Sequence, residues 1–232
     1  MLEEIKGWRH VFKLDPDKEI SDIRLQKICE SGTDAILVGG TQGIDYDNTV
    51  ELLSRVRRYP IPCALEVSSM EAICAGFDLY FIPIVLNATD PEWILKPHRE
   101  GLKRFWPFID WNQVAVEGYV VLNPESSVAR LTKTEGNLQD GDVLSYARMA
   151  EHMLHLPIFY LEYSGKWGDP LLVKKVKNVL KNTQLFYGGG IFSPEQAKEM
   201  ANWADTVVVG NAVYESFETA LKTVKAVKVH TE

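Results

Sequence analysis

Eight short apolar segments recur along the chain, and longer stretches with amphipathic spacing separate them. The apolar segments lie near residues 11, 35, 63, 80, 114, 158, 184 and 206, and they are rich in Val, Ile, Phe and Tyr. Several lack polar alternation, which is typical of strands that are buried on both faces of a parallel sheet. Strand–helix alternation that repeats eight times predicts an α/β fold of the closed (β/α)₈ type, the TIM barrel.

The third crossover departs from this pattern. Only the residues S-S-M-E-A-I-C-A-G-F-D, 68 to 78, separate the third strand from the fourth. A crossover with its helix needs at least ~10 to 12 residues, so we expect a loop or a single turn in place of the third helix. Because TIM barrels commonly run ~200 to 250 residues as one domain, we expect residues 1–232 to form a single (β/α)₈-barrel domain.

Composition restricts the classes of function. The net charge of −7 argues against a nucleic-acid-binding surface, because such binding relies on many Lys and Arg contacts to phosphates. No apolar run approaches the ~20 residues of a membrane span, and the N-terminus lacks a secretory pattern. Cys29, Cys63 and Cys74 are odd in number and widely spaced. We therefore expect free packing thiols in a cytoplasmic protein.

Glycines end the last two strands of the predicted barrel. Gly188–Gly190 follow the seventh strand, ahead of a helix start at Ser193, and Gly210 with Asn211 follows the eighth. The loops after strands seven and eight of TIM barrels frequently bind phosphate, and glycine lets the backbone approach the anion closely. We expect a phosphate site here, and the alternative is that these glycines only form tight turns.

Two other strand ends carry polar groups. The first strand ends F-K-L-D-P-D-K, in which Lys13 and Asp15 lie two residues apart and so share one face of a strand. The second ends V-G-G-T at Thr41, where a hydroxyl and two glycines suit an anion or hydrated Mg²⁺. Lys13 could then meet phosphate and Asp15 a metal ion. A solvated turn remains the alternative, since D-P-D-K has turn composition.

The sixth strand contains an unusual acid. Tyr160, Glu162 and Ser164 alternate with apolar neighbours and project to one side. A Glu in an apolar strand is costly unless it is paired or used, so we expect Glu162 to contact the substrate. The alternative is a core carboxylate that Lys13 or a backbone group satisfies.

Two more acids, Glu66 on the third strand and Glu117 on the fifth, are also candidates for the barrel interior, and we expect them to be structural or to support residues that contact the substrate. The five His residues have no metal-ligand spacing, and no Ser-His-Asp or Cys-His arrangement is visible.

Together these motifs resemble a known family. The segments W-R-H-V-F-K-L-D-P-D-K, V-G-G-T, A-L-E-V-S, Y-F-I-P-I-V-L-N, E-G-Y-V-V-L-N-P, Y-L-E-Y-S-G, F-Y-G-G-G-I and V-V-V-G-N are similar to those of the geranylgeranylglyceryl phosphate synthase superfamily. The similarity is closer to its bacterial PcrB branch, and it runs from about residue 6 to residue 225. Such enzymes are TIM barrels in which a loop replaces the third helix.

The resemblance implies a reaction and its site. The 3-hydroxyl of sn-glycerol 1-phosphate attacks C1 of an all-trans polyprenyl diphosphate, for this branch the heptaprenyl compound, and diphosphate leaves. Asp15 and Thr41 match the Mg²⁺ positions of the family, and Glu162 and Asp15 are the expected catalytic residues. The positions that match the glycerol-phosphate contacts are Lys13, Tyr160, Leu161, Glu162, Tyr163, Ser164, Gly165, Gly190, Gly210 and Asn211.

The resemblance also implies partners. Members of the branch are homodimers, and the lipid tail implies a transient membrane contact. Residues 93–109, W-I-L-K-P-H-R-E-G-L-K-R-F-W-P-F-I, are a candidate wall for the tail, with basic residues near the diphosphate. The alternative for this segment is an ordinary amphipathic barrel helix.

Two other functions remain open. A phosphate-binding TIM-barrel isomerase or aldolase would need a second acid–base residue or a Schiff-base Lys at a strand end, where Lys13 is the only candidate. A non-catalytic phosphate-ligand-binding protein would need neither Asp15 nor Glu162.

Overall fold

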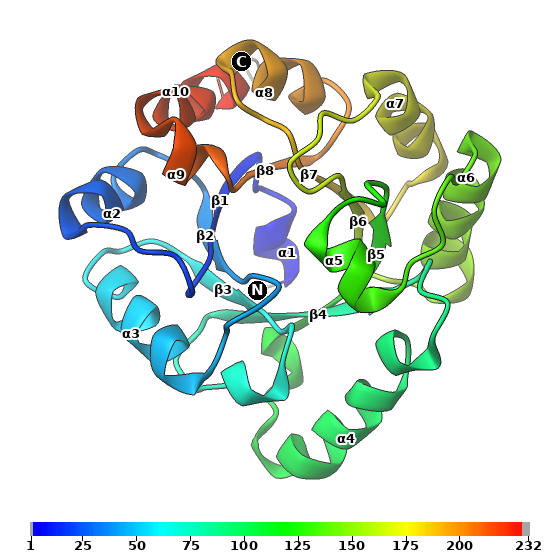
Figure 1. Cartoon of the computed structure of the whole chain (residues 1–232), viewed down its shortest axis with the longest axis horizontal. Coiled ribbons are helices and arrows are strands. Elements are labelled where there is room, and N and C mark those ends of the chain that lie inside the picture. Colours follow the sequence, from blue (N-terminus) through cyan, green and yellow to red (C-terminus); the bar gives the residue numbers. More distant parts are fainter. Residues whose placement is uncertain (1, 229–232) are drawn as a thin grey trace.

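Eight parallel strands close into a barrel in the order of the sequence (Figure 1). The structure is a computed structural model, and it describes residues 2–228. The strands are β1 (His10–Leu14), β2 (Ala35–Val38), β3 (Cys63–Glu66), β4 (Leu79–Val85), β5 (Val114–Val121), β6 (Ile158–Glu162), β7 (Gln184–Gly188) and β8 (Thr206–Val209). Strand β8 pairs with β1, so no edge remains open. The predicted TIM barrel is confirmed.

Helices surround most of the barrel. The long ones are α2 (Asp22–Cys29), α3 (Tyr46–Val56), α4 (Lys96–Phe105), α6 (Asp140–Arg148), α7 (Pro170–Val179), α8 (Pro194–Ala201) and α10 (Phe217–Lys228). Short helices are α1 (Leu2–Ile5), α5 (Ser127–Thr132) and α9 (Ala212–Glu215). The Ser193 side chain caps α8, and Pro194 occupies the first helical position, where a missing N–H costs nothing. No helix among residues 2–228 has the length and apolarity to cross a membrane.

The barrel interior changes from apolar to polar along its axis. At the N-terminal end, Ile5 and Trp8 are buried beneath the barrel, and Trp8 packs against Phe81 with 6.0 Å between ring centroids. Towards the C-terminal ends of the strands, inward positions carry charged and phenolic side chains, which are Lys13, Glu66, Glu117, Tyr119, Tyr160 and Glu162. This polarity places the chemistry at the end where TIM-barrel active sites lie.

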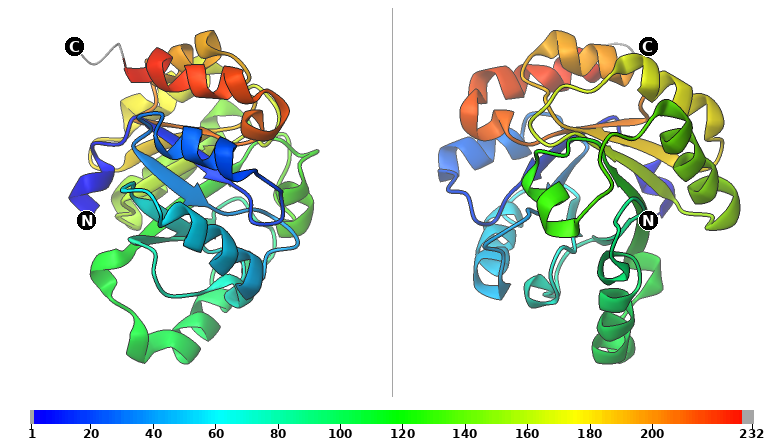
Figure 2. Two further views of the ribbon diagram at one scale, coloured as in Figure 1. Left: turned by 90° about the vertical axis from the view of Figure 1, so that its left-hand side faces the viewer. Right: turned by 45° about the vertical axis from the view of Figure 1, so that its right-hand side comes forward.

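The outer face of the barrel is covered unevenly. Outward side chains of most strands, such as Phe12 and Ile36, are fully buried under helices. Those of β4 and the start of β5 are only half-buried, namely Tyr80, Ile82, Ile84, Val114 and Val116. The crossover from β3 to β4 contains one short turn, Met70–Ala72, and α4 stands away from the strands (Figures 1 and 2). The expected loss of the third helix is confirmed, and it leaves this face uncovered.

Candidate functional site

One continuous cavity of about 1240 Å³ begins at the C-terminal end of the barrel and extends over the uncovered outer face of β4. Its barrel end contains Lys13, Asp15, Glu162 and the glycines that follow β7. Its outer end is apolar and lies between the outer residues of β4 and β5 on one side and α4 on the other, with Ile82 and Leu102 as examples of the two walls. The cavity therefore joins a polar pocket to an apolar groove.

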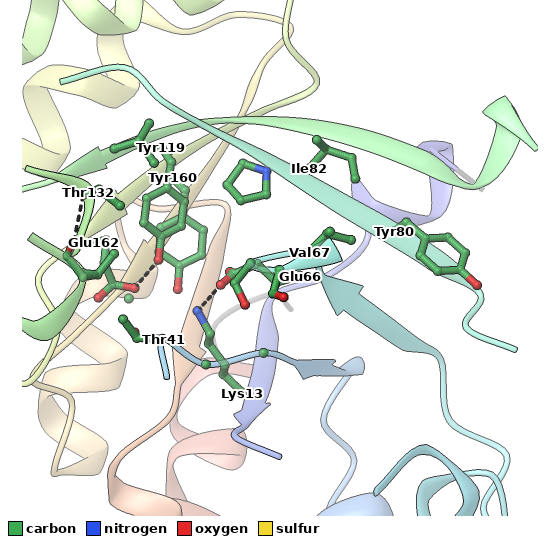
Figure 3. Close-up of a pocket in the computed structure, with 18 of the residues that line it drawn as sticks. Lys13, Thr41, Glu66, Val67, Tyr80, Ile82, Tyr119, Thr132, Tyr160 and Glu162 are labelled. Atoms are coloured by element: carbon green, nitrogen blue, oxygen red, sulfur yellow. Dashed lines mark hydrogen bonds and ion pairs between the residues drawn. The ribbon is translucent and has the colours of Figure 1, made fainter. Parts of the chain in front are cut away.

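Glu162 is held rigidly at the end of β6. One carboxylate oxygen accepts the Ser164 backbone N–H at 2.5 Å and the Ser164 hydroxyl at 3.0 Å. The other accepts the Tyr119 hydroxyl at 2.7 Å (Figure 3). Ser164 has a φ of 24°, a conformation that favours glycine. The carboxylate thus fixes an unusual turn and remains 6% exposed to the cavity.

Lys13 pairs with Glu66 and not with Glu162. Its Nζ lies 2.5 Å from Glu66 Oε1 (Figure 3), with the Tyr160 ring centroid 5.8 Å away. Burial would lower the pKa of Lys13, but the carboxylates of Glu66 and Glu162 outweigh it and hold the pKa above its usual value. The Lys13 ammonium therefore stays charged where an anionic substrate would bind. The alternative for Glu162 is a core carboxylate that Lys13 or a backbone group satisfies: Lys13 makes no hydrogen bond to it, whereas the Ser164 backbone N–H does.

Glu117 lies in the barrel interior, outside the residues that line the cavity. It is fully buried, and within residues 2–228 neither carboxyl oxygen has a hydrogen-bond partner. Burial and the neighbouring Glu66 carboxylate raise the pKa of Glu117 well above its ordinary value. This environment favours the neutral carboxyl form of Glu117, because an isolated buried charge would be far more costly.

Tyr160 packs against both the acids and the glycines. Its ring stacks on Tyr119 with 4.7 Å between centroids, and its hydroxyl is buried without a partner in the described chain. A Cβ on Gly188 would lie 2.2 Å from that hydroxyl, so only glycine fits there. The Tyr160 hydroxyl belongs to a side chain that lines the cavity, where a bound ligand could supply its missing partner.

The glycine turns predicted to bind phosphate come together. Gly190 has a φ of 64°, and a Cβ there would lie 2.2 Å from the Trp167 backbone nitrogen. Gly165, with a φ of 75°, lies opposite Asn211 on the turn that begins α9. All three, with Gly210, line the barrel end of the cavity. This clustering of backbone turns matches the phosphate-binding arrangement of TIM barrels.

Asp15 and Thr41 follow the ends of β1 and β2. Both line the cavity, and a Cβ on Gly40 would lie 2.5 Å from Asp15 Oδ1, so the carboxylate fills the space that glycine leaves. Burial raises the pKa of Asp15, which a bound cation would counteract. Within residues 2–228 no three His, Cys, Asp or Glu side chains cluster as a metal site. One carboxylate and one hydroxyl suit Mg²⁺ that keeps waters and shares phosphate oxygens.

The structure separates two expected residues from the others. Leu161 and Tyr163 alternate with Tyr160 and Glu162, and their side chains belong to the outer core beneath the helices. They contribute backbone geometry, as in the Tyr163 N–H that donates to the Gly188 carbonyl at 2.8 Å. Their side chains do not reach the cavity.

The wall predicted from residues 93–109 is confirmed in part. Small and apolar residues of α4 and its flanks line the groove, including Pro97, Gly101 and Phe105. Lys96, Arg99, Lys103 and Arg104 of α4 are exposed and do not line it, whereas His98 does. That basic residues of this segment lie near the diphosphate stays a prediction. Lys18 and Arg130 are the basic residues that line the cavity in addition to Lys13.

Sequence reasoning found one wall of the groove but missed its floor. The outward residues of β4 and the turn around Ile73 form the floor of the groove, yet they read as ordinary core positions. The sequence did contain a signal. The fourth strand is apolar on both faces, and the crossover before it is too short to form a helix, so one apolar face must stay uncovered. Tyr119, which holds Glu162, was also missed, since cross-strand partners are not visible before the register is known.

Fold and site together define a TIM barrel whose polar, glycine-lined end opens into an apolar groove. Residues 3–228 match the PcrB family. The chain is 60% identical over 227 residues to the heptaprenylglyceryl phosphate synthase of Anoxybacillus flavithermus, covering 98% of each chain. It is 58% identical to that of Geobacillus kaustophilus, covering 98% of this chain and 95% of the other. The chain belongs to the PcrB family.

Solved structures agree on the fold. The geranylgeranylglyceryl phosphate synthase of Thermoplasma acidophilum, in complex with sn-glycerol-1-phosphate, superposes with a TM-score of 0.86 at 24% identity over 98% of this chain and 96% of that one. The enzyme of the same name from Thermoplasma volcanium gives 0.83 at 26% identity over the same shares.

Proposed function

We propose that the protein transfers a heptaprenyl group from heptaprenyl diphosphate to the 3-hydroxyl of sn-glycerol 1-phosphate. The ether bond forms as the glycerol oxygen attacks C1 of the prenyl chain, and diphosphate leaves with the electrons of the broken C–O bond. The observation that carries the proposal is the single cavity, which has a glycine-lined phosphate pocket at one end and an apolar groove at the other.

The polar end suits the glycerol phosphate. Lys13 and the turns at Gly190 and Gly210 would hold the phosphate, which fixes the nucleophile and removes the entropic cost of a chance encounter. Glu162 would accept the proton of the attacking hydroxyl. Its two hydrogen-bond partners, Tyr119 and Ser164, orient the carboxylate toward the cavity.

The apolar end suits the prenyl tail. Keeping apolar carbon out of water contributes about 0.8 kcal/mol per CH₂, so the groove can offset the cost of taking a long tail out of a lipid phase. A sugar-phosphate isomerase or aldolase has no use for such a groove, and Lys13, its only Schiff-base candidate, is tied to Glu66. We therefore do not favour that alternative, nor a non-catalytic binding protein, which would not need a carboxylate of Glu162 that reaches the cavity.

Mg²⁺ is the cofactor that we propose for the diphosphate. Asp15 and Thr41 would hold it, and Lys18 and Arg130 line the same cavity as further positive groups. When bound, Mg²⁺ supplies Lewis-acid stabilisation of the leaving diphosphate. We also propose that residues 1–232 act as one barrel domain and that the enzyme is a homodimer.

The test is a turnover assay with radiolabelled sn-glycerol 1-phosphate and prenyl diphosphates of increasing length. We expect an organic-extractable ether product that requires both substrates and Mg²⁺, with the longest chains preferred. Absence of product with every prenyl diphosphate would refute the proposal. Isomerisation of a sugar phosphate by the same preparation would favour the alternative.

A further inference from the structure

A patch of exposed apolar side chains surrounds the outer mouth of the groove. Leu95, Leu102, Phe108 and Trp111 line the cavity and yet are exposed, Leu95 by 67% and Phe108 by 84%. Trp106, 62% exposed, packs on Trp111 with 5.9 Å between ring centroids. Exposed aromatic clusters of this kind mark interaction sites. Because the same side chains face both the groove and the solvent, the groove opens directly onto this patch.

Basic side chains lie beside the patch. Helix α4, K-P-H-R-E-G-L-K-R-F, holds four Lys or Arg residues and one Glu in a chain whose net charge is −7. Lys96 and Arg99 form ion pairs with Glu92 and Glu100. Lys103 and Arg104 make no ion pair with any residue of the described range 2–228. Both belong to the last turn of α4, directly before Trp106, and Arg104 lies over the Phe105 ring, 5.1 Å from its centroid.

We propose that Leu95, Leu102, Phe108, Trp111 and Trp106, with Lys103 and Arg104, form a surface that docks on an anionic lipid membrane. Trp and Phe beside Lys and Arg are the composition of proteins that lie in the membrane interface, where aromatic rings enter the headgroup region and basic groups meet anionic lipid. Helix α4 has no buried residue and stands at the outside of the molecule (Figures 1 and 2), so the surface is accessible.

The proposed substrate is the reason to expect a membrane on this surface. The inference rests on the proposed function, in which a prenyl chain too apolar for water must enter the groove and a lipid product must leave it. A mouth that faces the bilayer lets both pass without exposure to water. A second copy of the chain seated on the patch would instead close this mouth, and we treat that arrangement as a competing outcome.

Vesicle binding tests the surface directly. The full chain is sedimented with vesicles of phosphatidylglycerol and phosphatidylcholine, and with phosphatidylcholine alone, without any prenyl diphosphate. We expect binding to the anionic vesicles that weakens with salt. Lys103→Gln/Arg104→Gln should bind roughly 20-fold more weakly, because each basic residue near such a surface contributes roughly fivefold. Trp106→Glu should also weaken binding, whereas the matched control Leu171→Glu, at a 64% exposed position on α7, should not.

Turnover separates docking from chemistry. With farnesyl diphosphate in solution, Lys103→Gln/Arg104→Gln and Trp106→Glu should both equal the wild type. With heptaprenyl diphosphate embedded in anionic vesicles, they should be about tenfold slower, in line with the lost binding. A wild type that ignores vesicles, or variants that bind them like the wild type, would overturn the inference. So would a Trp106→Glu variant that changes only the oligomeric mass. Loss of all turnover in a wild type that still binds vesicles would refute the proposed function alone.

Discussion

Replacing Glu162 by Gln separates the proposed base from a structural role. The variant keeps the shape of the side chain and removes its charge. The amide oxygen can still accept the Ser164 N–H, and the amide NH₂ can donate to the Tyr119 oxygen in place of the present bond. The Lys13–Glu66 pair is untouched, so no buried cation is left without its partner.

The stability cost follows from these contacts. Hydrogen bonds to a charged group contribute ~1.5 to 3 kcal/mol and neutral ones ~0.5 to 1.5 kcal/mol. With Ser164 and Tyr119 as partners, the variant should lose about 2 kcal/mol of unfolding free energy, or roughly 4 to 8 °C in Tm for a chain of this size. That is less than the ~3 to 5 kcal/mol of a broken buried ion pair.

The catalytic cost should be much larger. Removal of a general base lowers the rate by ~10²- to 10⁴-fold, and the loss should appear in kcat while KM for glycerol phosphate changes little. Tyr119→Phe is the matched control, because it removes one hydrogen bond to Glu162 and keeps the carboxylate. We expect it to lose about 1 kcal/mol of stability and less than about tenfold in kcat, below the range for a lost base.

Thermal unfolding and single-turnover rates of both variants distinguish a catalytic role of Glu162 from a structural one. The reasoning is refuted if Glu162→Gln melts lower than the wild type yet retains its kcat per folded molecule. Equal rate losses in Glu162→Gln and Tyr119→Phe would assign the effect to orientation and not to proton transfer.

Three further outcomes are expected. Asp15→Asn should retain its melting temperature and lose roughly 100-fold or more in turnover, since a metal ligand contributes several kcal/mol of charge stabilisation; near-normal activity at saturating Mg²⁺ would contradict this. Gly190→Ala should lose about 1 to 3 kcal/mol of stability and raise KM for glycerol phosphate. Gly210→Ala, whose Cβ would have 3.8 Å of clearance, should keep its stability. Equal melting temperatures of the two variants would count against the close packing of the turn at Gly190. Glu117 has a raised pKa in the folded state, so its contribution to the free energy of unfolding is fully present below its unfolded pKa of about 4.3 and declines by about 1.4 kcal/mol per pH unit above it. The stability of Glu117→Gln relative to the wild type should therefore increase with pH. A difference in urea unfolding that stays constant with pH would argue against the raised pKa of Glu117.

Periodicity was sufficient to predict the barrel. All eight apolar segments are strands, because a two-sided apolar run of four to eight residues has few other ways to be buried. The strand-end rule also placed Lys13, Asp15, Glu162 and Gly190 around one cavity, since parallel strands bring their carboxyl ends to one face.

The ion-pair partners of the charged side chains in the barrel could not be predicted in the same way. Lys13 has three acids within the barrel that compete for it, and the sequence does not say that β3 supplies its partner, Glu66. That choice depends on the shear of the barrel, which sets the heights of neighbouring strands. For Leu161 and Tyr163 the sequence pattern was the better guide, because strand alternation already placed their side chains outward. Only the family resemblance counted them among the substrate contacts.

The missing helix links the fold to the chemistry. A helix in the β3–β4 crossover would cover Tyr80, Ile82 and Ile84, as other helices cover Phe12 and Ile36. Its absence leaves apolar surface half-exposed, and a stable protein gains nothing from that exposure when the groove is empty. The same surface becomes buried when a prenyl tail occupies the groove. One short crossover therefore converts part of the barrel's outer core into a binding site, and it places that site beside the catalytic end without any change to the eight strands.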